Sequence, residues 1–109
     1  MTRGLDAILQ RIKDNPSVTL VRRYLALVAE LSDDAEKARR MLAVAKAIQS
    51  TRPSEALRVA YLVYSMGREL LPALDIMIAV LEARGRSEKL KSLRAERERL
   101  LTTQAYGSP

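Results

Sequence analysis

The residue types with the most evident chemistry in this chain are cations close to its C-terminus. Residues 84–99 hold seven Lys or Arg and three Glu, so this segment accounts for +4 of the chain's net charge of +6. Six of these cations form a candidate basic patch: Arg84, Arg86, Lys89, Lys91, Arg94 and Arg97. Such a patch suits nucleic acid or an acidic partner. Because the three Glu dilute the charge and no aromatic residue is interleaved for base stacking, we favour a solvated helix over a nucleic-acid-binding surface.

The chain lacks residue types on which many catalytic sites depend. The chain has no Cys and no His, which excludes thiolate nucleophiles, disulfides, imidazole metal ligands and Ser–His or Cys–His pairs. The carboxylates of Asp33, Asp34 and Glu36 are close in sequence, but their spacing fits the start of a helix better than a cation site. The four glycines are isolated from one another, so no phosphate-binding loop is present. We therefore expect no catalytic residue, no metal and no cofactor.

Asp75 is notable because it interrupts the most apolar stretch of the chain, residues 70–81. An unpaired carboxylate is strongly disfavoured in an apolar interior, so Asp75 must be exposed or paired. We expect an ion pair with an arginine, for which the candidates are Arg40, Arg58 and Arg68. The alternative is a place at the floor of a functional site.

The elements that position these residues are helices. Apolar residues recur at helical spacing through almost the whole chain, and no period-two alternation or hairpin dipeptide suggests a strand. The fold class is therefore all-α, with about six short helices near 5–13, 17–31, 33–49, 53–66, 69–83 and 87–101. We expect one domain, residues 1–101, and a flexible polar tail, residues 102–109. No apolar stretch is long enough to span a membrane, and the default compartment is the cytoplasm.

Two of the expected helices begin with a related pattern, in which the second copy follows the first after 37 residues. The shared residues are Pro16, Ser17, Leu20, Tyr24 and Leu25 in the first copy and Pro53, Ser54, Leu57, Tyr61 and Leu62 in the second. Self-similarity of this length is typical of stacked helical pairs. Tyr24 and Tyr61 take equivalent places in the pattern, which favours a shared packing role. Tyr64 is then the tyrosine best suited to contact a ligand.

The pattern resembles a degenerate tetratricopeptide-repeat array, in which helical pairs of about 34 residues stack side by side. Pro16 and Pro53 match the Pro that this family places just before each new repeat. Ala38 and Ala73 match its small residue early in the second helix of a pair. The resemblance covers roughly residues 15–101 and implies stacked antiparallel helical pairs. The second to fifth helices would form two repeats, and the first and sixth helices would be N- and C-terminal caps.

The same resemblance implies a concave groove lined by the first helix of each pair. The groove residues carried over on this basis are Leu20, Arg23, Leu27, Leu57, Ala60 and Tyr64. The expected function is that of a small non-catalytic adaptor or chaperone-like scaffold, which holds a helix or extended segment of another protein in an apolar, Arg-rimmed groove. Arg23 and nearby cations favour an acidic partner.

Two other functions remain open at this point. One is a self-assembling subunit, a homo-oligomer that uses the apolar helices between residues 53 and 83. The other, less favoured, is a nucleic-acid-binding protein that uses the basic C-terminal helix, for which a steep dependence of affinity on salt is expected.

Overall fold

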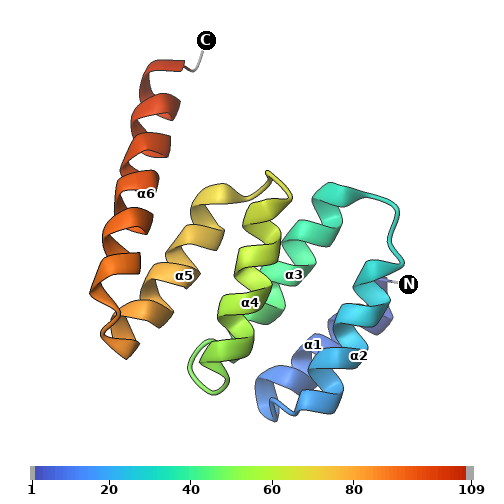
Figure 1. The fold of residues 1–109 in the computed structure, drawn as a ribbon. Helices are drawn as coiled ribbons and strands as arrows, with labels where there is room; N and C mark the ends of the chain where they lie inside the picture. The colour runs from blue at the N-terminus through green and yellow to red at the C-terminus, as the bar shows by residue number, and fades with distance from the viewer. Residues whose placement is uncertain (1, 108–109) are drawn as a thin grey trace.

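The computed structural model of this chain describes residues 2–107 and contains helices joined by short turns (Figure 1). The helices are α1 (Thr2–Asp14), α2 (Val18–Ala29), α3 (Asp34–Ile48), α4 (Pro53–Ser65), α5 (Leu70–Arg84) and α6 (Ser87–Gly107). No strand occurs between residues 2 and 107. The predictions of an all-α fold and of six helices are therefore confirmed. No helix in this described part is both long enough and apolar enough to cross a bilayer.

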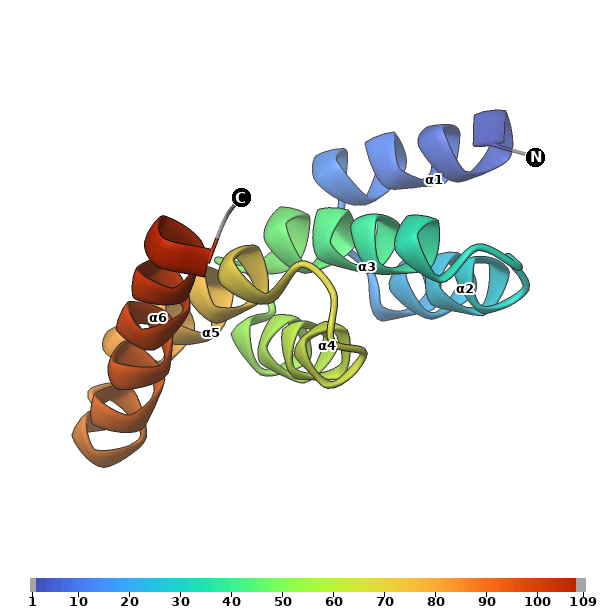
Figure 2. The ribbon, with the colours of Figure 1, turned by 90° about the horizontal axis from the view of Figure 1, so that it is seen from above.

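Successive helices run antiparallel and pack side by side, so that α5 lies between α4 and α6 (Figure 1). In addition to its neighbours in sequence, α3 contacts α1 and α5. These contacts place α1, α3 and α5 in one layer and α2 and α4 in the other (Figure 2). The molecule measures 39 × 37 × 18 Å, and its short dimension corresponds to two helices of roughly 10 Å diameter each.

The packing repeats after 35 residues rather than after 37. α2 begins at Val18, and α4 begins 35 residues later at Pro53. The innermost side chains of the two helices have the same offset and are each at most 1% exposed: Val21, Tyr24 and Val28 in α2, and Ala56, Val59 and Val63 in α4. Ala38 of α3 and Ala73 of α5, also 35 residues apart, are both fully buried. The burial pattern thus defines a structural repeat of two helical pairs.

The predicted equivalence of Tyr24 and Tyr61 is therefore wrong. Tyr24 is fully buried, whereas Tyr61 is 54% exposed. The cause lies in the two prolines, because Pro53 is the first residue of α4 whereas Pro16 lies two residues before the start of α2. A shift of two residues turns a helix by about 200°. Residues matched by the 37-residue pattern consequently face opposite sides of their helices.

Local interactions set the helix ends where the sequence predicted breaks. Ser17 Oγ accepts a hydrogen bond from the Leu20 N–H at 3.1 Å, and Asp33 Oδ1 accepts one from the Ala35 N–H at 2.9 Å. These side chains satisfy N–H groups that a helix leaves free at its start. α5 ends at Gly85, whose φ of 70° is a left-handed value that glycine adopts without steric cost.

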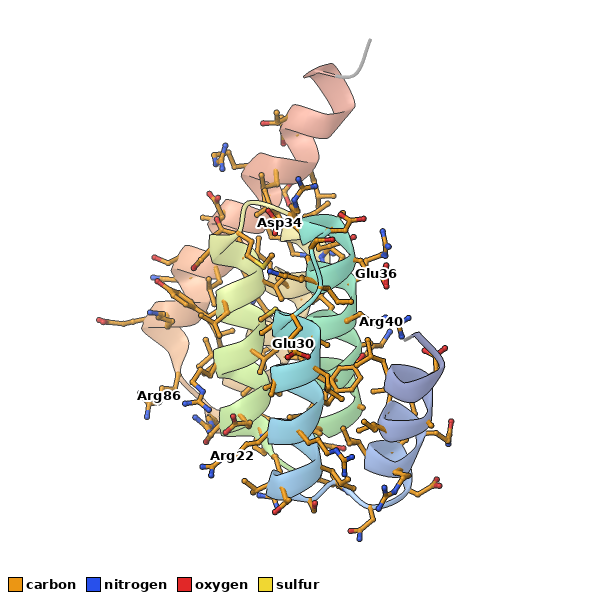
Figure 3. The ribbon with its side chains drawn as sticks, turned by 90° about the vertical axis from the view of Figure 1, so that its right-hand side faces the viewer. Arg22, Glu30, Asp34, Glu36, Arg40 and Arg86 are labelled. Carbon is orange, nitrogen blue, oxygen red and sulfur yellow. The ribbon has the colours of Figure 1, made fainter. Side chains whose placement is uncertain are left out.

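The core consists of a main apolar cluster to which all the helices contribute and a small second cluster of Ala38, Val63 and Ala73. Tyr24, in the main cluster, is the largest fully buried side chain. The Tyr24 hydroxyl has no hydrogen-bond partner among the described residues. Burial raises the pKa of Tyr24, and the neighbouring Arg40 guanidinium offsets part of that effect. Arg40 of α3, labelled in Figure 3, forms an ion pair with Asp6 of α1. The first helix is thus tied to the core by both apolar contacts and a charge pair.

The sixth helix is longer than the sequence indicated. It continues to Gly107 and so includes residues 102–107 of the segment that the sequence assigned to a flexible polar tail. The hydroxyls of Thr102 and Thr103 each donate a hydrogen bond, at 2.9 Å, to the backbone carbonyl four residues earlier. These polar side chains therefore bond within the helix instead of competing with it. Residues 108–109 lie outside the described part of the chain.

Candidate functional site

A groove runs between α4 and α6, with α5 as its floor. Its volume is ≈ 360 Å³, and it is lined by Ser54, Leu57, Arg58, Tyr61, Met77, Leu81, Arg86 and Lys89. The lining residues of α4 lie three, four and seven positions after Ser54, and those of α5 are four apart, so each set lies along one face of its helix. The turn from α5 into α6 carries the last two lining residues to the opposite wall.

The floor of the groove is apolar. Met77 and Leu81 are 2% and 4% exposed, and Leu57 is half-buried beside them. Tyr61 stands on the same wall with more than half of its surface exposed. An exposed aromatic ring next to a buried apolar floor is the composition found at the centres of protein-binding surfaces.

The rim of the groove is positive. Arg86 and Lys89 form no ion pair with any residue in the described part of the chain. Arg84, the last residue of α5, donates a hydrogen bond to Ser54 of α4 at the end of the groove. Arg58, by contrast, is neutralised by an ion pair with a glutamate of its own helix. Since no carboxylate is among the lining residues, the rim cations are not compensated within the groove.

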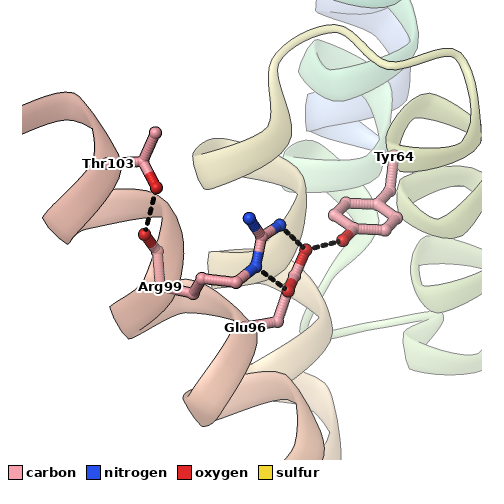
Figure 4. A network of polar contacts seen from close by, with 4 residues as sticks. All are labelled: Tyr64, Glu96, Arg99 and Thr103. Atoms are coloured by element: carbon pink, nitrogen blue, oxygen red, sulfur yellow. Dashed lines mark hydrogen bonds and ion pairs between the residues drawn. The ribbon is translucent and has the colours of Figure 1, made fainter. Parts of the chain in front are cut away.

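Tyr64 lies one turn beyond Tyr61 on the same face of α4 and links that helix to α6 (Figure 4). Its hydroxyl donates a hydrogen bond to Glu96, and Arg99 Nε and Nη2 donate to the same carboxylate at 2.8 and 2.7 Å. The hydrogen bonds from Arg99, which are the larger cause, and the hydrogen bond from Tyr64 lower the pKa of Glu96 to about 2. The hydrogen bond to the carboxylate also raises the pKa of Tyr64. The charge of Glu96 is therefore held by Arg99 and does not offset the rim cations.

The six cations of the predicted basic patch do not form one surface. Arg94 and Arg97 are ion-paired with two carboxylates of α5, those of Glu82 and Asp75. The other four, of which the first three border the groove, are Arg84, Arg86, Lys89 and Lys91. The unpaired part of the patch is thus concentrated at the turn between α5 and α6. In Figure 3, Arg86 and Arg22 of α2 lie toward the lower end of the molecule, whereas Asp34 and Glu36 of α3 lie toward its upper end.

Asp75 is exposed and paired, but none of the arginines predicted as its partner holds it. Its side chain is 54% exposed, and its Oδ1 atom lies 2.6 Å from Nε of Arg97. The predicted candidate Arg40 pairs with Asp6 instead. The antiparallel packing of α6 on α5 brings Arg97 to Asp75 from 22 residues farther along the chain. Asp75 does not line the groove between α4 and α6.

The predicted groove residues of α4 are only partly correct. Leu57 lines the groove, and Tyr64 lies beside it. Ala60 is fully buried, so its assignment to the groove is wrong. Adjacent residues of a helix point about 100° apart, and in α4 it is the next residue, Tyr61, that faces the groove.

The predicted groove residues of α2 lie elsewhere. Leu20 is half-buried against the core, and Arg23 is exposed on the surface of α2. Leu27, which is 37% exposed, borders a separate depression of ≈ 280 Å³ between α1 and α2. The structure therefore does not join the two halves of the predicted site into one groove.

Five lining residues were not among the site residues predicted from the sequence: Ser54, Arg58, Tyr61, Met77 and Leu81. Tyr61 was assigned to the core because of the 37-residue pattern. The predicted helix start at Pro53 pointed to the 35-residue offset instead. At that offset, position 61 corresponds to Ala26, which is exposed. Met77 and Leu81 belong to a helix that is apolar on nearly all sides, so periodicity does not indicate which of its faces borders a groove.

Fold and site together define an all-helical array of antiparallel pairs that carries an apolar groove with a cationic rim. No family model, no curated protein and no solved structure matches the chain. The groove is therefore the feature of this chain that indicates a function.

Proposed function

We propose that this protein is a non-catalytic binding module that holds a segment of another protein in the groove between α4 and α6. The observation that carries the proposal is Tyr61, an exposed aromatic ring beside the half-buried Leu57 and above the buried Met77 and Leu81. Burial of the exposed Tyr61 ring and of the accessible part of Leu57 by a partner supplies the driving force for association.

The repeated packing supports a scaffold role. Arrays of stacked helical pairs present extended surfaces whose shape comes from many small contacts, and such arrays serve as binding surfaces. The 35-residue offset is close to the period of about 34 residues of tetratricopeptide repeats, and Ala38 and Ala73 share this offset. The proposal therefore retains the resemblance to that family, with the groove placed on the second helical pair.

The composition supports a non-catalytic role. Without Cys or His, the common nucleophile–base pairs cannot be assembled from this chain. The hydroxyl of Tyr64, beside the groove, donates a hydrogen bond to Glu96, so it is engaged in holding two helices together.

A selection from a random peptide library displayed on phage tests the proposal, with the purified full chain as target. The Tyr61→Glu variant should lose most of the binding of any selected peptide, because it places a charge over the apolar floor. Leu62→Glu is the matched control, because Leu62 is the next residue, is 50% exposed and does not line the groove. Equal binding by the wild type and the Tyr61→Glu variant, or no enrichment of any peptide, would contradict the proposal.

Self-assembly is the second candidate function, and Leu62 is the observation that favours it. Leu62 and Tyr61 are adjacent on α4 and both at least half exposed, which gives an apolar strip that a second copy could cover. Sedimentation equilibrium over a wide range of concentration distinguishes the two functions. Dimerisation that is lost in both Leu62→Glu and Tyr61→Glu supports self-assembly through this strip, and a strict monomer excludes it.

A further inference from the structure

We infer that the occupant of the groove between α4 and α6 is an acidic protein segment, in which an apolar side chain is flanked by Asp or Glu. This inference rests on the proposed function and names the chemistry of the partner. Its basis is the juxtaposition of the apolar floor with Arg84, Arg86 and Lys89 at one end of the groove.

The charge balance around the groove favours an acidic partner. The carboxylates on its walls and near its ends are already engaged, Glu55 by Arg58, Glu82 by Arg94 and Glu96 by Arg99. Arg86 and Lys89 have no such partner among residues 4–103, the range whose side chains are described with the exception of residue 87. Glu88 is exposed and does not line the groove. A bound carboxylate would therefore meet positive charge without displacing an existing ion pair.

The floor and the rim of the groove contribute differently to binding. The floor of Met77 and Leu81 is nearly inaccessible to water, and the ring of Tyr61 offers an apolar face beside it. Apolar contact at the centre supplies affinity, whereas exposed rim charges select the partner and speed its approach. A segment with an apolar residue between carboxylates satisfies both parts at once.

The residues that line the groove favour a protein segment over a nucleic acid. Tyr61 is the single aromatic residue among the lining residues, whereas single-stranded nucleic acids are bound on successive aromatic platforms. The two buried apolar residues of the floor offer no hydrogen-bonding partner to bases or phosphates. The cations lie at one end of the groove rather than along it, which suits one or two carboxylates better than a continuous phosphate backbone.

The experiment sorts the peptides selected on the wild-type chain by composition and measures their affinity by fluorescence anisotropy. The expected result is an excess of Asp and Glu around an apolar anchor. Affinity should fall about tenfold or more in the double variant Arg86→Glu/Lys89→Glu, since both rim charges are reversed. The control is Arg39→Glu/Arg68→Glu, which makes the same change in net charge at two exposed cations outside the groove and should leave affinity within about twofold.

Two outcomes overturn the inference while the proposed function stands. Selected peptides that lose binding in Tyr61→Glu but carry no excess of acidic residues show that the groove binds protein without the predicted charge preference. Acidic peptides that bind equally to the wild type and to Arg86→Glu/Lys89→Glu show that the rim cations do not recognise them. Peptides that bind independently of Tyr61 contradict the proposed function itself.

Two further measurements test the competing occupants. A fluorescent 20-nucleotide single-stranded DNA and the corresponding RNA are titrated at low salt. Tight binding that is lost in Arg86→Glu/Lys89→Glu would assign the cations to nucleic acid and overturn the inference. Self-association that is lost in both Tyr61→Glu and Arg86→Glu/Lys89→Glu would assign the groove to a second copy of this chain and would likewise overturn it. A monomer that does not bind either nucleic acid supports it.

Discussion

The Tyr64 hydroxyl on α4 is hydrogen-bonded to the Glu96 carboxylate on α6. The two helices do not pack directly on each other, because α5 lies between them (Figure 1). The bond therefore connects the two walls of the groove at the end opposite the turn between α5 and α6 (Figure 4). It also gives Tyr64, which the sequence favoured as a ligand contact, a structural role.

Removal of the Tyr64 hydroxyl should be visible in the titration of Glu96. In Tyr64→Phe the pKa of Glu96 should rise from about 2, because the carboxylate loses one of the hydrogen bonds that favour its charged form. Arg99→Gln should raise it further, since the bonds from Arg99 are the larger cause. The measurement is an NMR titration of the side-chain carboxyl resonances. An unchanged pKa in Tyr64→Phe would show that the bond between the helices is absent in solution.

The same bond predicts a particular dependence of stability on pH. A carboxyl whose pKa is lowered by folding stabilises the folded state above its unfolded pKa, and this contribution is lost as the pH falls toward the folded pKa. For Glu96 that window runs from pH 4.5 down to about 2. The difference in unfolding free energy between the wild type and Tyr64→Phe should therefore shrink across this window. Urea denaturation at pH 5 and at several lower values tests this, and a constant difference would contradict it.

The two tyrosines of the 37-residue pattern should respond oppositely to truncation. Tyr24→Ala should destabilise the fold by about 3–5 kcal/mol, as expected for a large side chain removed from a packed core. Tyr61→Ala should change the unfolding free energy by no more than about 0.5 kcal/mol, because its ring is largely exposed. Thermal or urea denaturation of both variants decides the point.

A control with smaller change refines the comparison. Tyr24→Phe removes a buried hydroxyl that has no partner among the described residues, so it should be neutral or stabilising by up to about 1 kcal/mol. Similar losses in Tyr24→Ala and Tyr61→Ala would mean that the two residues pack alike after all, and would contradict the 35-residue register.

The turn between α4 and α5 contains a strained residue. Glu69 has a φ of 51°, a left-handed value that costs a side-chain-bearing residue roughly 1–2 kcal/mol. Glu69→Gly should stabilise the protein by a few tenths to about 1 kcal/mol, the gain being reduced by the greater freedom of glycine in the unfolded chain. Chemical denaturation measures the change. Glu69→Ala keeps the Cβ atom and should give no such gain, so equal stabilisation by both variants would point to the charge rather than to the backbone.

Several features of this fold could be predicted from residues and their spacing alone. Periodic apolar residues and the breaks at Pro16, Pro53 and Gly85 indicated six helices, and all six are present. The side chain of Asp33 caps its helix as its position suggested. These features depend on contacts within a few residues of the chain, and a linear pattern records such contacts directly.

The site depended on information that a linear pattern does not contain. The sequence determined that this chain forms helices with an apolar surplus between residues 53 and 83 and a basic stretch after it. Tertiary structure decided that Tyr61 faces outward while Tyr24 is buried and that Arg97 pairs with Asp75. It also placed Arg86 and Lys89 beside an apolar floor, with no ion pair to any side chain that the structure describes. The physical reason is rotational register: a shift of two residues rotates a helix by about half a turn, and only the packing of neighbouring helices selects the face that is covered.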